Sequence, residues 1–239
     1  MIVTIDGPAG AGKSTVARRL AAVLDIAYLD TGAMYRAIAL RAIRARAPWD
    51  DQEWLTQLAE EAELQMECDR DGVRVRLDGE DVTEAIRTME VNASTGRVAR
   101  VPGVRTVLVR QQRQIGRRLG SLVTEGRDQG SVAFPDADIK FYMDADVEKR
   151  AERRLLELRA DGEEVTLQHV LANVQERDRT DSERSTAPLT VPAGAIRMDT
   201  TNLSIAEVLD RVLDHLRRAG LLEPPLNKPA APSSAPPIP

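Results

Sequence analysis

The amino-acid sequence predicts an α/β fold of three layers, α/β/α, with helices on both faces of a central parallel sheet. Short apolar segments alternate with helical segments through most of the 239 residues, a pattern typical of parallel strands joined by helices. A glycine-rich loop follows the first apolar segment and leads directly into a helical segment. Aromatic residues make up only 3% of the chain, so Leu, Val, Ile, Ala and Met must form the core.

The N-terminal part of the chain alternates regularly between strand and helix. We expect strands at residues 1–6 and 26–30 and helices at 15–24, 31–47 and 50–63. Pro48 ends the second helix, because proline cannot continue the helical hydrogen bonding. Asp50 and Asp51 begin the third helix, where acidic side chains suit the positive end of the helix dipole.

A short segment, residues 64–82, departs from this alternation of strands and helices. Residues 64–67 and 73–77 alternate apolar and polar side chains, and Asp-Gly turns lie on both sides of the second run. This two-residue period with tight turns predicts a small antiparallel hairpin or meander. We therefore expect an antiparallel insert beside the parallel sheet.

The rest of the chain returns to the α/β pattern and ends in a proline-rich tail. We expect a helix at 92–118 with a break near Pro102, strands at 121–124, 139–143 and 196–199, and helices at 147–159 and 166–181. Ser204 and Glu207 form a capping box for a last helix, which Gly220 ends. Seven of the thirteen prolines lie within residues 224–239, which predicts a disordered tail with polyproline character. The sequence thus predicts a single domain at 1–223 and a tail at 224–239.

The glycine-rich loop is the most specific motif of the chain. Residues 7–14 read GPAGAGKS and match the P-loop pattern G-x-x-x-x-G-K-[ST] at every fixed position. Such a loop directs backbone N–H groups at phosphate oxygens, and the helix that follows adds a favourable dipole. Lys13 can reach the β- and γ-phosphates, and the Ser14 hydroxyl can ligate Mg²⁺. A chance glycine-rich turn is the alternative, but the strand before the loop and the helix after it favour a nucleoside triphosphate site. We expect ATP to be held by Gly7, Pro8, Ala9, Gly10, Ala11, Gly12, Lys13, Ser14 and Thr15, and Mg²⁺ by Ser14.

Composition restricts the class of protein. Cys68 is the only cysteine, so there is no intramolecular disulfide framework. No apolar run approaches the roughly 20 residues of a membrane span, and the predicted strand at the N-terminus leaves no room for a signal peptide ahead of the loop. The net charge of −5 argues against a protein that coats nucleic acid. We expect a cytoplasmic monomer whose partners are small nucleotides, with neither a nucleic acid polymer nor a membrane.

Arginines lie just beyond the predicted strands, where ligands of open α/β sheets bind. Arg36 lies about one helical turn after Thr31, and Arg127 and Asp128 directly follow the strand at 121–124. A solvated helix surface is the alternative interpretation for each arginine. Grouped around one cleft, however, they suit a kinase whose acceptor is itself phosphorylated, because phosphoryl transfer relies on positioning and on cationic stabilisation.

A second group of charged residues lies on one predicted helix. Arg177, Asp181 and Arg184 are spaced i, i+4 and i+7, which puts them on the same helical face. Two other functions remain open on the residues alone: a P-loop kinase for another small molecule, and a regulatory GTPase. The GTPase would need a guanine-reading Asn-Lys-x-Asp, and the nearest match, at 227–230, lacks the aspartate.

Several segments together resemble the bacterial cytidylate kinase family. They are residues 6–15 (DGPAGAGKST), 29–36 (LDTGAMYR), 78–82 (DGEDV) with 86–87 (IR), 126–130 (GRDQG), 134–137 (FPDA), 176–179 (ERDR) and 187–189 (APL). Matching segments run in the family's order from residue 1 to about residue 216, and the antiparallel insert separates this family from adenylate kinases. The resemblance implies transfer of the ATP γ-phosphate to CMP or dCMP, which gives CDP or dCDP and ADP. It also implies a nucleoside-monophosphate-binding insert at about 50–97 and a lid at about 153–166.

The same resemblance assigns roles to individual residues. Its implied catalytic residues are Lys13, Arg127, Arg184 and Arg153, the last of which, with Arg154, would clamp ATP when the lid closes. Its implied acceptor site consists of Thr31, Arg36, Arg105, Arg127, Asp128, Arg177, Asp181 and Arg184. In that site Arg36, Arg127 and Arg184 hold the acceptor phosphate, as planar guanidinium groups do well. Arg105 and Asp128 read the cytosine edge, and Arg177 and Asp181 contact the sugar.

One position departs from the family pattern. Gly96 lies where some relatives have a serine that contacts the pyrimidine or the sugar. Ser94 or Thr95 could take over that contact. The preference among CMP, dCMP and UMP is therefore left open by the sequence.

Overall fold

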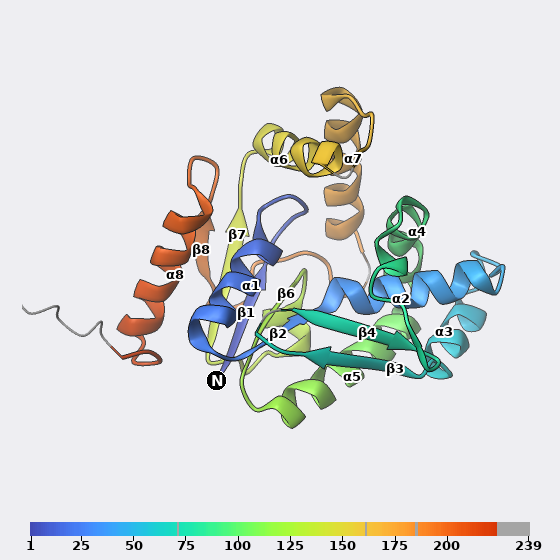
Figure 1. Cartoon of the computed structure of the whole chain (residues 1–239), viewed down its shortest axis with the longest axis horizontal. Helices are drawn as coiled ribbons and strands as arrows, with labels where there is room; N and C mark the ends of the chain where they lie inside the picture. The colour runs from blue at the N-terminus through green and yellow to red at the C-terminus, as the bar shows by residue number, and fades with distance from the viewer. Residues whose placement is uncertain (71, 161, 185, 224–239) are drawn as a thin grey trace, which may run out of the picture.

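A parallel sheet forms the centre of the molecule. The computed structural model describes residues 1–70, 72–160, 162–184 and 186–223, so the predicted disordered tail lies outside the described residues. The strands are β1 (Ile2–Asp6), β2 (Ala27–Asp30), β6 (Leu122–Gly126), β7 (Ile139–Asp144) and β8 (Ile196–Asp199), all paired in parallel in the order β2-β6-β1-β7-β8. β1 is thus the middle strand, with β6 and β7 on either side (Figure 1).

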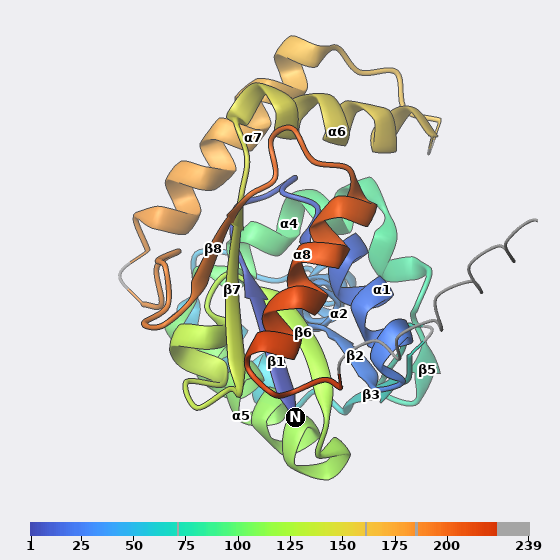
Figure 2. The same ribbon diagram turned by 90° about the vertical axis from the view of Figure 1, so that its left-hand side faces the viewer.

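Helices cover both faces of this sheet, as the sequence predicts. On one face, α1 (Lys13–Leu24) and α8 (Ile205–Arg218) bury Leu20, Phe141 and Leu216 against the strands, and Figure 2 shows α8 crossing that face. On the other face, α2 (Thr31–Arg44) and α5 (Pro102–Leu119) pack over Leu29 and Leu122. The three-layer α/β/α fold is confirmed.

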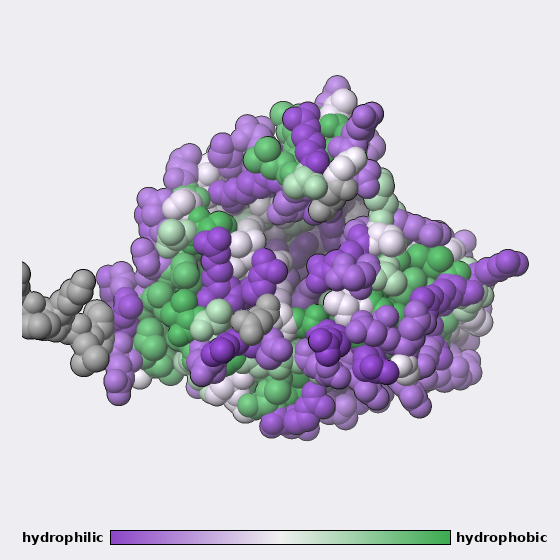
Figure 3. Space-filling model, in the orientation of Figure 1, coloured by the Kyte–Doolittle hydropathy of each residue, from purple (hydrophilic) through white to green (hydrophobic). Residues whose placement is uncertain are grey.

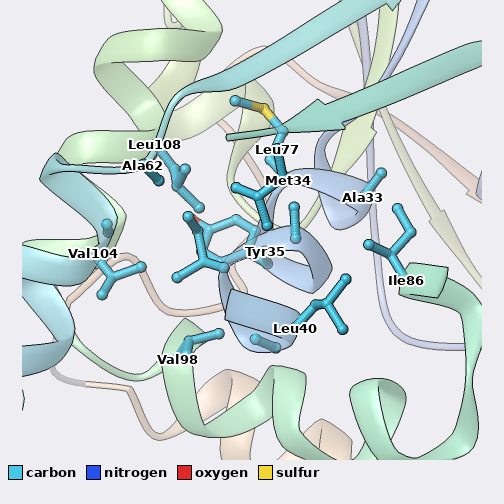
Figure 4. Close-up of a cluster of buried hydrophobic side chains, with 14 of the residues drawn as sticks. Ala33, Met34, Tyr35, Leu40, Ala62, Leu77, Ile86, Val98, Val104 and Leu108 are labelled. Atoms are coloured by element: carbon cyan, nitrogen blue, oxygen red, sulfur yellow. The ribbon is translucent and has the colours of Figure 1, made fainter. Parts of the chain in front are cut away.

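The antiparallel insert is also confirmed, and it is firmly attached to the main domain. Its elements are α3 (Gln52–Glu60), β3 (Leu64–Cys68), β4 (Val73–Leu77), β5 (Glu80–Asp81), the 3₁₀ turn η1 (Ala85–Arg87) and α4 (Met89–Ala99), with sheet order β3-β4-β5. Leu77 and Ile86 of the insert share one apolar cluster with Met34 and Tyr35 of α2 and Leu108 of α5 (Figure 4). Because one core serves both parts, and because the N–H of Tyr28 in β2 donates to the carbonyl of Asp69 at 2.9 Å, the insert is held beside the edge strand of the main sheet.

Two helices stand over the carboxyl edge of the main sheet (Figure 1). α6 (Val147–Ala160) follows β7, and α7 (Leu167–Ser182) packs against it through Ala151, Leu155, Val170 and Val174. This small apolar cluster is separate from the two large ones. Most of the segment expected as a lid, residues 153–160, therefore belongs to helix α6.

The observed elements differ from the expected ones mainly at their ends. α2 ends at Arg44 instead of running to about Ala47, because Arg46 takes a left-handed conformation with φ of 51° and the N–H of Ala47 turns back to the carbonyl of Ala42. The break expected near Pro102 is confirmed: α4 and α5 are separate helices, since Val101 is extended before Pro102. Within the described ranges, no helix is both long enough and apolar enough to span a bilayer.

Candidate active site

The glycine-rich loop connects β1 to α1 at the carboxyl edge of the sheet. Gly7 and Gly10 both have positive φ, of 148° and 76°. A Cβ on Gly7 would lie 1.9 Å from the carbonyl oxygen of Met143 in β7, so only glycine fits there. Close packing against β7 thus fixes the start of the loop beside the neighbouring strand.

Lys13 is the first residue of α1 and is buried below the loop. Its Nζ donates a hydrogen bond to the carbonyl oxygen of Pro8 at 2.8 Å. Burial, together with the nearby cation of Arg127, lowers the pKa of Lys13 from 10.5 to about 7, although Glu125 and Asp6 oppose the shift. The buried position below the loop therefore brings the pKa of Lys13 into the neutral range of pH.

Asp6, at the end of β1, fixes the segment that follows β6. Its carboxylate accepts hydrogen bonds from the N–H groups of Gln129 and Gly130, each at 2.7 Å. These residues begin η2 (Gln129–Ala133), a single π-helical turn next to Arg127 and Asp128. Burial raises the pKa of Asp6 to about 6 even though both backbone bonds oppose the shift.

The Ser14 hydroxyl lies beside a carboxylate that the sequence analysis did not single out. Ser14 Oγ donates to Glu125 Oε1 at 2.8 Å, and the backbone oxygen of Glu125 accepts from Thr31 Oγ1 at 2.8 Å. Glu125 precedes the last residue of β6, the strand next to β1. The sequence does show an acidic residue at the end of a predicted strand. To see that this residue faces the P-loop, however, one must know that β6 pairs with β1.

The structure brings Arg127, Asp181 and Arg184 together. Arg127 Nε donates to Asp181 Oδ2 at 2.7 Å, and Arg184 forms an ion pair with the other carboxylate oxygen of Asp181. Burial alone would raise the pKa of Asp181, but the two guanidinium groups hold it below its usual value. One buried carboxylate thus positions two arginines, of which Arg127 directly follows β6 and Arg184 lies just beyond the end of α7.

Arg105 and Asp128 also meet, and both are buried. Their ion pair is accompanied by a hydrogen bond from Arg105 Nη1 to the carbonyl of Ala99 at 3.2 Å. The Arg105 guanidinium lies 5.6 Å from the ring centroid of Tyr35, a cation–π arrangement. This pair forms a polar wall where α2, α4 and α5 converge.

Arg36 lies on the α2 side of the same cleft. Its Nη2 forms an ion pair with Asp30 Oδ2 at 2.7 Å, and Asp30 also caps α2 through the N–H of Ala33. Arg177 keeps part of its surface in contact with solvent, but the protein around its guanidinium displaces water there, and this desolvation together with the cation of Arg127 lowers the pKa of Arg177 to about 10. Within the described part of the chain, we find no ion pair for Arg177.

Several arginines of this cleft retain unused donors. The Nε–H groups of Arg36, Arg105 and Arg184 are buried and have no hydrogen-bond partner among the described residues. An unpaired buried donor is costly in a folded protein. These three donors therefore indicate that the cleft is built to receive an anion.

Figure 3 shows the cleft as a hollow below α6 and α7 that is lined by hydrophilic residues. Helix α7, which carries Arg177 and Asp181, lies above this hollow (Figure 1), and Arg127 contacts Asp181 from the end of β6. No cluster of three or more His, Cys, Asp or Glu side chains suited to a metal occurs among the residues the structure describes.

Two predicted residues, Arg153 and Arg154, pair with neither Asp128 nor Asp181. Arg153 donates to the Thr200 hydroxyl at 3.2 Å and to the carbonyl of Thr201 at 3.4 Å, on the loop after β8. Arg154 pairs with Glu157 on the surface of α6. In this conformation both arginines contact protein, and their expected role as an ATP clamp stays a prediction.

A family model described as cytidylate kinase matches residues 3–218. A cytidylate kinase of Caldanaerobacter subterraneus subsp. tengcongensis is 46% identical over 216 residues, which cover 90% of this chain and 94% of that protein. A bifunctional pantoate ligase/cytidylate kinase of a Synechococcus strain is 49% identical over 215 residues, 89% of this chain but 40% of that protein. Among solved structures, an uncharacterized protein from Eubacterium ventriosum aligns with a TM-score of 0.50 at 11% identity over 91% of this chain and 98% of its own, and shares the fold alone.

Proposed function

This chain belongs to the cytidylate kinase family, and on that premise we propose how its cleft transfers the γ-phosphoryl group of ATP to CMP or dCMP. The chain is an ATP-dependent phosphotransferase that yields CDP or dCDP and ADP. The observation that supports the residue assignment best is the buried Asp181 carboxylate flanked by Arg127 and Arg184. This group lies near Lys13, whose pKa is lowered by burial and by the cation of Arg127.

The loop side of the cleft is proposed to hold ATP. The backbone of residues 7–15 surrounds the phosphates, and Lys13 exchanges its bond to the Pro8 carbonyl for the β- and γ-phosphate oxygens. The oxygens of Ser14 and Glu125, 2.8 Å apart, fit Mg²⁺, which prefers a few oxygen ligands together with phosphates and water. Bound Mg²⁺ would neutralise charge on the β- and γ-phosphates.

The opposite side is proposed to hold the acceptor. Arg36, Arg127 and Arg184 bind its phosphate, using the free Nε–H of Arg36 and Arg184. Asp128 accepts from the cytosine amine while Arg105 binds the neighbouring acceptors of the base edge. The sugar is bound by Arg177 and Asp181, and Thr31 supports this wall through its bond to the backbone of Glu125.

The chemical step needs positioning more than a nucleophilic side chain. An ionised oxygen of the acceptor phosphate forms a bond to the γ-phosphorus while the bond from that phosphorus to the leaving oxygen of ADP breaks. Lys13, Arg127 and Arg184 stabilise the charge that shifts between the two nucleotides, and Arg153 is proposed to complete the set when the lid closes. The cytoplasmic location and the monomeric state are part of this proposal.

An acceptor panel tests the proposal. ADP release from ATP–Mg²⁺ is measured with CMP, dCMP, UMP, AMP, GMP and no acceptor. We expect turnover with CMP and dCMP well above the rest. ATP hydrolysis without a preferred acceptor would contradict the kinase assignment. Turnover of UMP close to that of CMP would instead indicate that Gly96 widens the choice of base.

ATP binding is expected to be linked to proton uptake by Lys13. With a pKa of about 7 before binding, Lys13 is neutral in about half of the protein molecules at pH 7. Bound phosphate oxygens favour its charged form and so cause it to take up a proton. Uptake on binding of Mg²⁺–ATP should therefore be about half a proton at pH 7, following from that pKa, and should increase toward pH 9. Titration calorimetry in buffers of different ionisation enthalpy measures it.

The control for this linkage is Lys13→Arg, because an arginine stays charged over the whole range. Working between pH 7 and 9 keeps Asp6, whose pKa is about 6, largely ionised. Equal uptake by Lys13→Arg and the wild type would show that another group takes up the proton.

A further inference from the structure

Arg150, which the sequence analysis did not consider, joins the two halves of the cleft. It lies in the first turn of α6 and is only 6% exposed. Its Nε donates to the carbonyl of Ala145 at 2.8 Å, its Nη1 donates to the carbonyl of Ala9 in the P-loop at 3.0 Å, and Nη1 also lies 2.7 Å from Asp178 Oδ2 in α7. One guanidinium thus contacts the loop that would bind ATP and the helix that carries the acceptor site.

The contact with the P-loop is close enough to fix its conformation. A Cβ on Gly10 would lie 2.9 Å from the carbonyl oxygen of Arg150 and 3.0 Å from its Cβ. In a planar trans peptide the C=O and the next N–H point in opposite directions. By holding the Ala9 carbonyl, Arg150 therefore sets the direction of the Gly10 N–H, one of the donors that such a loop offers to phosphate.

The contact with α7 connects this loop to the acceptor side. Asp178 lies on the same helix as Arg177 and Asp181, and its Oδ1 is buried without a partner among the described residues. Over those residues, the pair of Arg150 with Asp178 is the only ion pair that joins α6 to α7. The apolar cluster of Ala151, Leu155, Val170 and Val174 also holds α6 against α7, but this guanidinium is the contact that reaches α7 and the Ala9 carbonyl at once.

We propose that Arg150 is a positioning residue that couples ATP binding to acceptor binding: it holds the Ala9–Gly10 peptide with one contact and α7 with the other. This inference rests on the proposed function of the two sides of the cleft. It predicts that the nucleotides bind cooperatively, each increasing the affinity for the other by the same factor.

The test is the affinity for CMP with and without a saturating, non-reacting β,γ-imido analogue of ATP and Mg²⁺. Titration calorimetry on the full chain gives the ratio of the two dissociation constants, expected at about 5- to 150-fold in the wild type. Asp178→Asn keeps the Ala9 contact and removes the charge pair, so the ratio should fall toward one while the analogue alone binds as before. Arg150→Met should lower both the ratio and the affinity for the analogue, and Arg150→Lys should restore part of the ratio.

Lys149→Met, which replaces an exposed cation on the same helix but outside the expected lid, is the matched control and should keep the wild-type ratio. A purely structural link would lower the melting temperature of the variants and leave the ratio unchanged, and that result would overturn the proposal. A wild-type ratio of one would overturn it as well. If Arg150→Met does not fold, Asp178→Asn decides. Failure of the wild type to bind CMP would contradict the proposed function instead, and the ratio would then be measured with the acceptor that the panel identifies.

Discussion

Replacing Lys13 by methionine is expected to reduce kcat by about 10³-fold or more, because each preorganised charged donor at developing charge contributes about 10² to 10³ and this one also positions ATP. Methionine keeps the length and apolar volume of the side chain but cannot donate to the β- and γ-phosphates. The KM for CMP should change far less than kcat, since Lys13 lies on the ATP side. Steady-state ADP release measures both.

Stability separates this loss from unfolding. The pKa of Lys13 in the folded protein, about 7, lies below its ordinary value of 10.5, so the unfolded chain binds more protons between these values. The buried charge therefore destabilises the fold fully below pH 7, and this cost is relieved as the pH rises toward 10.5. Lys13→Met without nucleotide should be at least as stable as the wild type at pH 6 to 7.

The control variant is Lys149→Met, which replaces a surface lysine paired with Glu152 and should leave turnover unchanged. Near-normal turnover of Lys13→Met would contradict the P-loop assignment.

The second large effect is expected for Arg127→Met. Arg127 is proposed to contact the acceptor phosphate and the transferred group, so kcat/KM for CMP should fall by about 10² to 10³-fold, the typical loss for such a donor. Stability should fall by about 1–3 kcal/mol, because the buried Asp181 loses one of its two partners. Arg127→Lys keeps the charge but lacks the planar guanidinium, so its kcat/KM and its stability should lie between those of the wild type and those of Arg127→Met.

A double variant separates the two roles of Arg127. Arg127→Met combined with Asp181→Asn removes the uncompensated carboxylate, so it should recover part of the stability without recovering turnover. Arg218→Met, an exposed arginine at the end of α8, is the matched control. Chemical denaturation and CMP-dependent kinetics measure the two effects. Unchanged kcat/KM for CMP in Arg127→Met would remove this arginine from the site.

Much of the site could be predicted because the chemistry sits in short segments. The P-loop needs only eight consecutive residues and the strand and helix beside them, and the sequence contains all three. Arg36 and Arg127 could be placed near one another because the carboxyl ends of parallel strands share one edge of a sheet. The spacing of Arg177 and Asp181 follows from the helical period, but the expectation that Arg184 lies on the same helix is wrong, because α7 ends at Ser182.

The partners of these residues could not be predicted in the same way. Ser14 and Glu125 are 111 positions apart, Asp6 and Gln129 are 123 apart, and Arg150 and Ala9 are 141 apart. Each pair meets only because β1 lies between β6 and β7. The alternation of strands and helices in the sequence is compatible with other strand orders.

The sequence by itself determined the class of fold, the P-loop motif and the places in the chain of the arginines that we propose to bind the acceptor, because local hydrogen bonding and side-chain periodicity act between residues close in the chain. Only the tertiary structure decided that one carboxylate, Asp181, holds two arginines, that Lys13 is buried with a lowered pKa, and that Arg150 joins the loop to α7. Burial and charge pairing depend on which distant segments pack together, and that is settled by the sheet order and the shared apolar core.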